Sequence, residues 1–143
     1  MNFDLVGKTA IVSGSTQGIG KAAAIELSKM GASIVMIARN EEKLQSSILD
    51  LDTSFDQNHS YLVADFSNPT NLKNAIQHYV SNGGKANILV NNTGGPKGGA
   101  IKDAPIEEFL SAFNQHLICN HILVQALYPL MKEDGFGRII NII

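Results

Sequence analysis

The chain has 143 residues, of which 44% are hydrophobic and 17% charged, as is usual for one folded domain. A formal net charge of -2, with scattered basic residues, gives no electrostatic basis for binding nucleic acid or an anionic membrane surface. A lone cysteine, Cys119, excludes an internal disulfide, and no segment has the length and apolar character of a signal peptide or a membrane span. We therefore expect a single cytoplasmic domain over residues 1–143 that binds neither nucleic acid nor membrane.

Short apolar runs alternate with segments of helical periodicity along the chain. Strands are predicted at residues 9–12, 33–38, 61–64, 87–91 and 138–143. Helices are predicted at residues 19–30, 41–51, 69–80 and 106–132, the third opened by an Asn68 cap before Pro69. Apolar strands separated by helices indicate a parallel sheet covered on both faces, so the expected fold is a doubly wound, Rossmann-like α/β domain.

The segment SGSTQGIG at residues 13–20 lies between the first strand and the first helix. Gly14, Gly18 and Gly20 permit a sharp turn and let backbone amides approach a bound group closely. The helix that follows directs the positive end of its dipole at that group, and Ser15 and Thr16 add hydroxyl donors. No lysine follows the last glycine as it does in kinase and ATPase phosphate loops. The segment favours a dinucleotide, and a turn without a ligand is the alternative.

Ligands of such sheets bind at the carboxyl ends of the strands, and this sequence places polar or small residues there. Arg39 and Asn40 follow the second strand, Asp65 and Phe66 follow the third, and NNTG at residues 91–94 ends the fourth. Arg39 stands where NAD-binding domains usually carry an acidic residue, and its planar guanidinium suits the 2'-phosphate of NADP. We therefore expect NADP(H) rather than NAD(H), with a solvated surface arginine as the alternative for Arg39.

Four motifs, in order and at matching spacing, resemble those of the classical short-chain dehydrogenase/reductase family over the whole chain. SGSTQGIG resembles the family's TG-x3-GIG, Asp65 is similar to its aspartate beside the adenine amino group, NNTG resembles NNAG, and GRIINI at residues 137–142 resembles the run into the fifth strand. The resemblance implies strand order 3-2-1-4-5, with further strands beyond the fifth. It implies cofactor contacts by Gly14, Ser15, Thr16, Gly18, Ile19, Gly20, Arg39, Asn40, Asp65, Phe66, Asn91, Thr93 and Gly94. Turn capping is the alternative for Asp65, and tying loops together is the alternative for Asn91 and Asn92.

The resemblance also implies the chemistry, which is hydride transfer between a nicotinamide and a carbonyl or alcohol carbon. The family's serine, tyrosine and lysine would follow Ile143, so we expect the chain to be part of a longer protein. The family's helix asparagine, which anchors a water for proton relay, corresponds to His116. Because histidine can also relay protons, His116 is the candidate catalytic residue, and a packed helix histidine is the alternative.

The expected activity is NADPH-dependent reduction of a 3-oxoacyl or ketone substrate, or the reverse alcohol oxidation, in a homodimer or homotetramer. No metal is expected. The alternative is a dinucleotide-binding fragment or pseudoenzyme without oxidoreductase activity. Lys97, in the loop GGPKGG, is interpreted as either a contact for a substrate anion or a solvated lysine.

Overall fold

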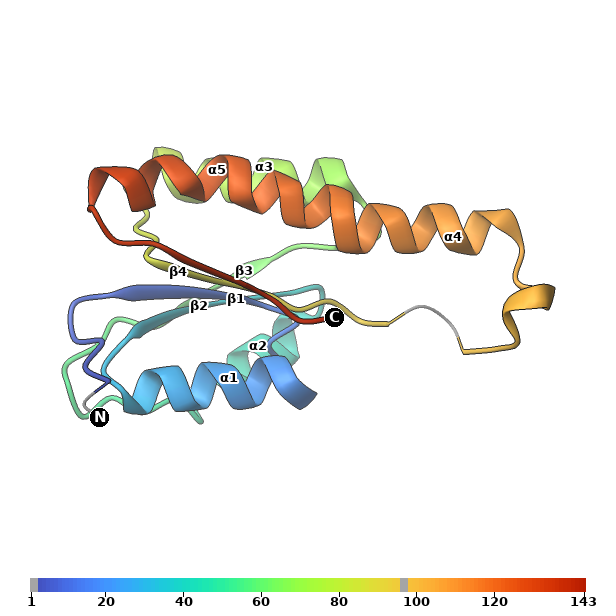
Figure 1. The fold of residues 1–143 in the computed structure, drawn as a ribbon. Coiled ribbons are helices and arrows are strands. Elements are labelled where there is room, and N and C mark those ends of the chain that lie inside the picture. Colours follow the sequence, from blue (N-terminus) through green and yellow to red (C-terminus); the bar gives the residue numbers. More distant parts are fainter. Residues whose placement is uncertain (1–2, 96–97) are drawn as a thin grey trace.

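The computed structural model describes residues 3–95 and 98–143, which form one sheet with helices on both faces (Figure 1). The strands are β1 (Thr9–Ser13), β2 (Ser33–Ala38), β3 (Ser60–Val63), β4 (Ile88–Asn91) and β5 (Arg138–Asn141). They lie in the order β3-β2-β1-β4-β5, and every neighbouring pair is parallel. The predicted fold class and strand order are confirmed.

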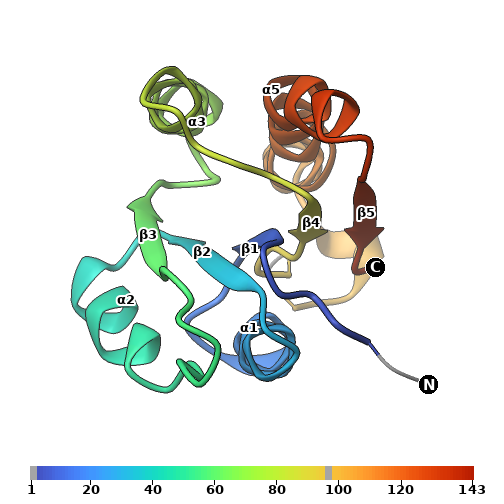
Figure 2. The ribbon, with the colours of Figure 1, turned by 90° about the vertical axis from the view of Figure 1, so that its left-hand side faces the viewer.

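Helices cover both faces of this sheet (Figure 2). On one face lie α1 (Gly18–Lys29) and α2 (Glu41–Ile48), and on the other lie α3 (Pro69–Ser81) and α5 (Cys119–Glu133). A 3-10 turn (Ile101–Asp103) and α4 (Ile106–Phe113) precede α5. Figure 1 shows α4 continuing the line of α5 past the carboxyl ends of the strands. No helix among the described residues is long and apolar enough to cross a membrane.

Two cores form because neighbouring side chains of a strand point to opposite faces of the sheet. Ile11 and Leu89 pack toward α3 and α5, where they meet Leu123. Val12 and Val90 belong to the core beneath α1 and α2. The strands are therefore apolar at successive positions, which is the pattern that predicted a sheet covered on both faces.

Most predicted bounds agree with the structure to within one or two residues, and Asn68 caps α3 by accepting a hydrogen bond from Asn71 N at 3.1 Å. α2 ends at Ile48, three residues before its predicted end. The next residues form a tighter turn, in which Asp50 N donates to Ser47 O and Leu51 N donates to Ile48 O. That turn returns Leu51 to the core beneath α1 and α2.

The predicted helix over residues 106–132 is interrupted by a π-helical turn (Asn114–Ile118) between α4 and α5. Cys119 N donates to Asn114 O, five residues back, which is the hydrogen bond that defines this geometry. Such turns are rare and frequently lie at functional sites. The hydrophobic periodicity of the sequence does not reveal this one.

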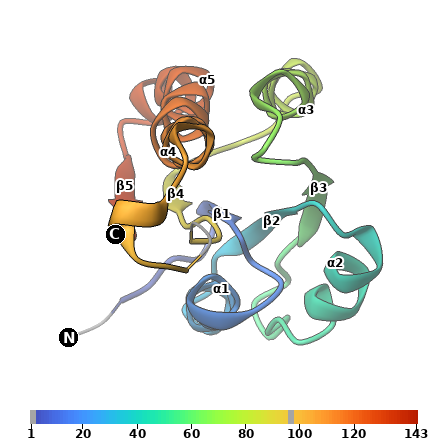
Figure 3. The ribbon, with the colours of Figure 1, turned by 90° about the vertical axis from the view of Figure 1, so that its right-hand side faces the viewer.

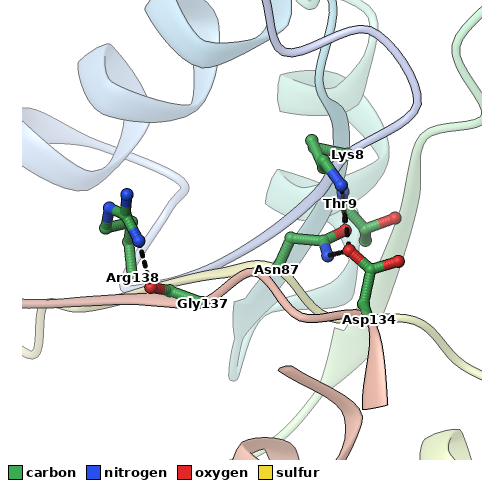
Figure 4. A network of polar contacts seen from close by, with 6 residues as sticks. All are labelled: Lys8, Thr9, Asn87, Asp134, Gly137 and Arg138. Atoms are coloured by element: carbon green, nitrogen blue, oxygen red, sulfur yellow. Dashed lines mark hydrogen bonds and ion pairs between the residues drawn. The ribbon is translucent and has the colours of Figure 1, made fainter. Parts of the chain in front are cut away.

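A polar cluster fastens the amino ends of β1 and β4 to the end of α5 (Figure 4). The buried Asn87 accepts from Thr9 N at 2.9 Å and donates to Asp134 Oδ2 at 2.8 Å, and Lys8 Nζ also reaches that oxygen at 2.9 Å. The Lys8 hydrogen bond holds the pKa of the Asp134 carboxyl below its usual range. This cluster lies at the end of the sheet opposite the predicted cofactor site.

We expect Asn87→Ala to lower the free energy of unfolding by about 2 kcal/mol, because it leaves the buried Thr9 N–H without its acceptor. Chemical denaturation checks this. Asn58→Ala, at an exposed loop position, is the matched control and should change stability by less than about 0.5 kcal/mol. Equal stabilities of the two variants would show that Asn87 does not fasten these strands.

Candidate functional site

A hollow of about 650 Å³ opens at the carboxyl ends of the strands, the end that Figure 3 faces. Its walls are the turn after β1, the tips after β2 and β3, the loop after β4 and one residue of the π turn. The lining residues are Gly14, Thr16, Gln17, Gly18, Ile19, Ala38, Arg39, Ala64, Asp65, Phe66, Ser67, Asn92, Thr93, Gly94, Gly95 and Gln115.

The turn after β1 and the first turn of α1 pack so closely on the loop after β4 that a glycine in each leaves no room for a side chain. Gly14 has a φ of +58°, and a Cβ there would lie 2.7 Å from Asn92 Nδ2 and against Asn92 O. A Cβ on Gly20 would lie 2.6 Å from the same Nδ2 and against Gly14 O. Asn92 Nδ2 donates to Gly14 O at 3.2 Å, and Asn92 N donates to Ser13 Oγ at 3.0 Å. Asn92 therefore ties the two loops together, as the alternative interpretation of this residue proposed.

The amino end of α1 faces this hollow through Gln17, Gly18 and Ile19. Gln17, the N-cap residue, makes no capping hydrogen bond with its side chain, and the first turn of α1 holds no acidic residue. The first backbone amides of a helix need acceptors, and an anion satisfies them together with the helix dipole. This end of α1 therefore suits a phosphate group.

Arg39 and Asp65 face the hollow from the tips of neighbouring strands. Asp65 Oδ1 accepts from Ser67 N at 2.9 Å, so Asp65 caps its turn and lines the hollow as well. The Ser67 hydrogen bonds, and then the charge of Arg39, hold the pKa of the Asp65 carboxyl below its usual range. An ionised carboxylate that accepts hydrogen bonds and a guanidinium that suits phosphate thus share one wall.

Nine of the residues predicted for the cofactor line the hollow, namely Gly14, Thr16, Gly18, Ile19, Arg39, Asp65, Phe66, Thr93 and Gly94. The other four do not, and the protein itself accounts for their positions. Ser15 and Gly20 are buried, and Asn40 caps α2 by accepting from Lys43 N at 2.8 Å. Asn91 is 1% exposed, and its Nδ2 donates to Asn141 Oδ1 at 2.8 Å, which ties β4 to β5.

His116 lies in the π turn, where its Nδ1 is 2.6 Å from Thr93 Oγ1. It does not line the hollow itself, but the neighbouring Gln115 does. Gln17 and Gln115 also line the hollow, but they were not predicted to do so. Neither glutamine is a residue that defines a sequence motif, and the position of each depends on the local backbone. Lys97 lies outside the described residues. Among those described, no group of three or more histidine, cysteine or acidic side chains is placed to hold a metal ion.

The chain matches the model of a known family, described as short chain dehydrogenase, over residues 8–143. The chain belongs to the short-chain dehydrogenase family. A tropinone reductase homolog of Arabidopsis thaliana is 35% identical over 141 residues, which are 98% of this chain and 53% of that protein. The human protein named inactive hydroxysteroid dehydrogenase-like protein 1 is 33% identical, over 95% of this chain and 42% of its own length.

Among solved structures, the L-sorbose reductase of Gluconobacter frateurii, complexed with NADPH and L-sorbose, resembles this short-chain dehydrogenase chain with a TM-score of 0.89. The two are 31% identical, and the match covers 99% of this chain and 54% of the reductase. The chain thus spans about half the length of the relatives that it matches. Membership assigns the chain to a family of oxidoreductases with a dinucleotide-binding fold.

Proposed function

We propose that this chain is the cofactor-binding part of an oxidoreductase that uses NADP(H). The observation that carries the proposal is that Arg39 and the uncapped amino end of α1 line the same hollow. A pyrophosphate fits the amide end of the helix, and a 2'-phosphate fits the guanidinium at the tip of β2. The Gluconobacter frateurii reductase, whose structure holds NADPH, supports the same choice of cofactor.

In this proposal, different residues around the hollow bind different groups of the cofactor. The turn from Gly14 to Ile19 would hold the pyrophosphate, Arg39 the 2'-phosphate and Asp65 the adenine amino group. Thr93 and Gly94 would lie along the ribose and nicotinamide end of the cofactor. When bound, NADPH supplies a hydride. The substrate that we propose is a carbonyl compound of the 3-oxoacyl or ketone type, or the corresponding alcohol in the reverse direction.

Titration of nicotinamide fluorescence with NADPH and NADH tests the cofactor proposal on the intact protein. We expect saturable binding of NADPH and binding at least about tenfold weaker for NADH, because a phosphate–guanidinium pair is worth about 1.5–3 kcal/mol. Tighter binding of NADH would overturn the assignment to Arg39. Binding of neither cofactor would overturn the proposal as a whole.

A second candidate is a protein that binds the dinucleotide without catalysing a reaction. His116 favours it, because the family's asparagine is replaced at a position implied in proton relay, and one relative is named inactive. Oxidation of NADPH by the intact protein with a panel of ketones and 3-oxoacyl thioesters separates the two candidates. Turnover of any carbonyl compound supports the reductase, and tight NADPH binding without turnover supports the second candidate.

We infer that the intact protein forms a homodimer or homotetramer through the outer face of α4. Apolar side chains at helical spacing along this face and into the π turn are each more than half exposed, namely Ile106, Phe109, Leu110, Phe113 and Leu117. Exposed apolar patches of this kind mark contact sites, and a second copy of the same helix offers a self-complementary partner.

Light scattering tests the assembly. We expect Phe113→Glu to lower the mass in solution toward that of one subunit, because a carboxylate would be buried in the contact. Phe55→Glu, at a loop position that is 50% exposed against 53% for Phe113, is the matched control and should leave the mass unchanged. An oligomer that survives Phe113→Glu would show that another surface forms the contact.

A further inference from the structure

We propose that the hydrogen bond between Thr93 and His116 is a positioning contact that sets the affinity of this chain for its dinucleotide. The inference rests on the proposed function, because the loop that the bond holds is one wall of the cofactor hollow. It assigns His116 the role of positioning a binding loop through Thr93.

The loop after β4 is tied on both sides by side chains. On one side, Asn92 Nδ2 donates to the carbonyl oxygens of Ser13 and Gly14. On the other side, Thr93 Oγ1 lies 2.6 Å from His116 Nδ1. Further along, a Cβ at Gly94 or Gly95 would meet nothing within 4 Å. The Thr93 contact is therefore the last side-chain hydrogen bond in the described part of this loop before two glycines whose Cβ positions are open.

Cys119, the first residue of α5 and the donor to Asn114 O in the π turn, contacts the opposite wall of the hollow. The buried Cys119 Sγ donates to Phe66 O at 3.3 Å, and Phe66 lines the hollow after β3. Burial, and then the charge of Asp65, raises the pKa of the Cys119 thiol to about 11, so the thiol keeps the proton that it donates. The loop after β3 thus holds the start of α5, directly after the π turn, and the π turn holds the loop after β4.

Both members of the pair differ from the motifs that this sequence resembles. NNTG has Thr93 where the family has alanine, and His116 stands where the family has asparagine. An alanine has no side-chain group that hydrogen-bonds, so the family's pair cannot form this contact. The Thr93 hydroxyl and the His116 imidazole form one hydrogen bond, which joins the wall of the hollow to a turn of unusual backbone geometry.

Breaking the bond should loosen the loop without removing any atom that would touch the pyrophosphate or the 2'-phosphate. The free protein would then lose part of its preformed wall, and ordering that wall would weaken binding. One hydrogen bond of ordinary strength corresponds to about a fivefold change in the dissociation constant.

The test is the dissociation constant for NADPH, measured by nicotinamide fluorescence on the intact protein and its variants. We expect Thr93→Val and His116→Phe each to raise the constant about fivefold, because each keeps the shape of its side chain and removes one partner. In the double variant the constant should be about five times that of the wild type, as in each single variant. Two independent sites would instead give a rise of roughly 25-fold. Thr93→Ser, which keeps the hydroxyl, should restore most of the affinity.

Thr53→Val and His121→Phe, at exposed positions outside the hollow, are the matched controls for the two substitutions. The nitrogen-15 chemical shift of His116 Nδ1 supplies a direct readout of the bond, and it should move in Thr93→Val but not in Thr53→Val. Wild-type affinity in Thr93→Val, or multiplied effects in the double variant, would overturn this inference and leave the proposed function standing. A wild type that binds neither NADPH nor NADH would overturn both.

Discussion

Replacing Gly14 by alanine is expected to reduce NADPH affinity by about 100-fold or more and to destabilise the fold by about 3 kcal/mol. The left-handed backbone at φ +58° costs an alanine about 1–2 kcal/mol, and the contact of its Cβ with Asn92 adds about as much in overpacking. Relief of that contact must move the turn that lines the hollow. Displacing the turn costs charge-assisted hydrogen bonds to phosphate, and each one is worth about 1.5–3 kcal/mol.

Gly135→Ala separates the two causes. Gly135 has a φ of +68°, close to that of Gly14, but a Cβ there would meet nothing within 4 Å, and it does not line the hollow. We expect this control to lose about 1 kcal/mol of stability and to bind NADPH as the wild type does. Fluorescence titration and chemical denaturation of both variants provide the comparison. If Gly14→Ala behaved like Gly135→Ala, the close packing against Asn92 would have no part in the site.

The fold could be predicted because its signals are local or periodic. Apolar runs mark the strands, and Asn68 before Pro69 marks the start of α3, where the structure shows that cap. The π turn was not predicted, because hydrophobic side chains continue across it at helical spacing. What distinguishes it is the backbone hydrogen bond from Cys119 N to Asn114 O, which the pattern of side chains does not reveal. The early end of α2 was missed for a related reason, since Leu51 is apolar in the sequence whether it ends a helix or returns from a turn.

The lining of the hollow could be predicted where a residue lies there because it directly follows a strand, as Arg39 and Asp65 do. The sequence alone did not distinguish residues that line the hollow from residues that support it. Asn91 and Asn92 are neighbours, but Asn91 ends β4 and bonds to β5, whereas Asn92 follows the strand and bonds to the glycine turn. The contact between Thr93 and His116 joins residues 23 positions apart, and only the folded chain brings them together.

Arg39→Ala is expected to weaken NADPH binding by about 10- to 100-fold and to leave NADH binding within about twofold of the wild type. The difference arises because the guanidinium can form charge-assisted hydrogen bonds with a 2'-phosphate, which NADH lacks. Arg39 is exposed at the tip after β2, and no carboxylate within the described chain forms a salt bridge with it. The ratio of the two dissociation constants is the decisive measurement, since a general loss of stability would weaken both cofactors alike.

Arg138→Ala is the matched control, because Arg138 begins β5 at the end of the sheet opposite the hollow, where its guanidinium lies 4.7 Å from the centre of the Phe136 ring. It should leave the ratio of the two constants unchanged.

Arg39→Asp should reverse the cofactor preference and favour NADH, since a carboxylate accepts hydrogen bonds from the ribose 2'-hydroxyl and repels a 2'-phosphate. Raising the salt concentration should reduce the wild-type preference for NADPH toward that of Arg39→Ala, because an exposed ion pair is screened. A preference for NADPH that survives both Arg39 substitutions would place the 2'-phosphate elsewhere in the hollow, and the choice of cofactor would then depend on the other polar groups of its wall.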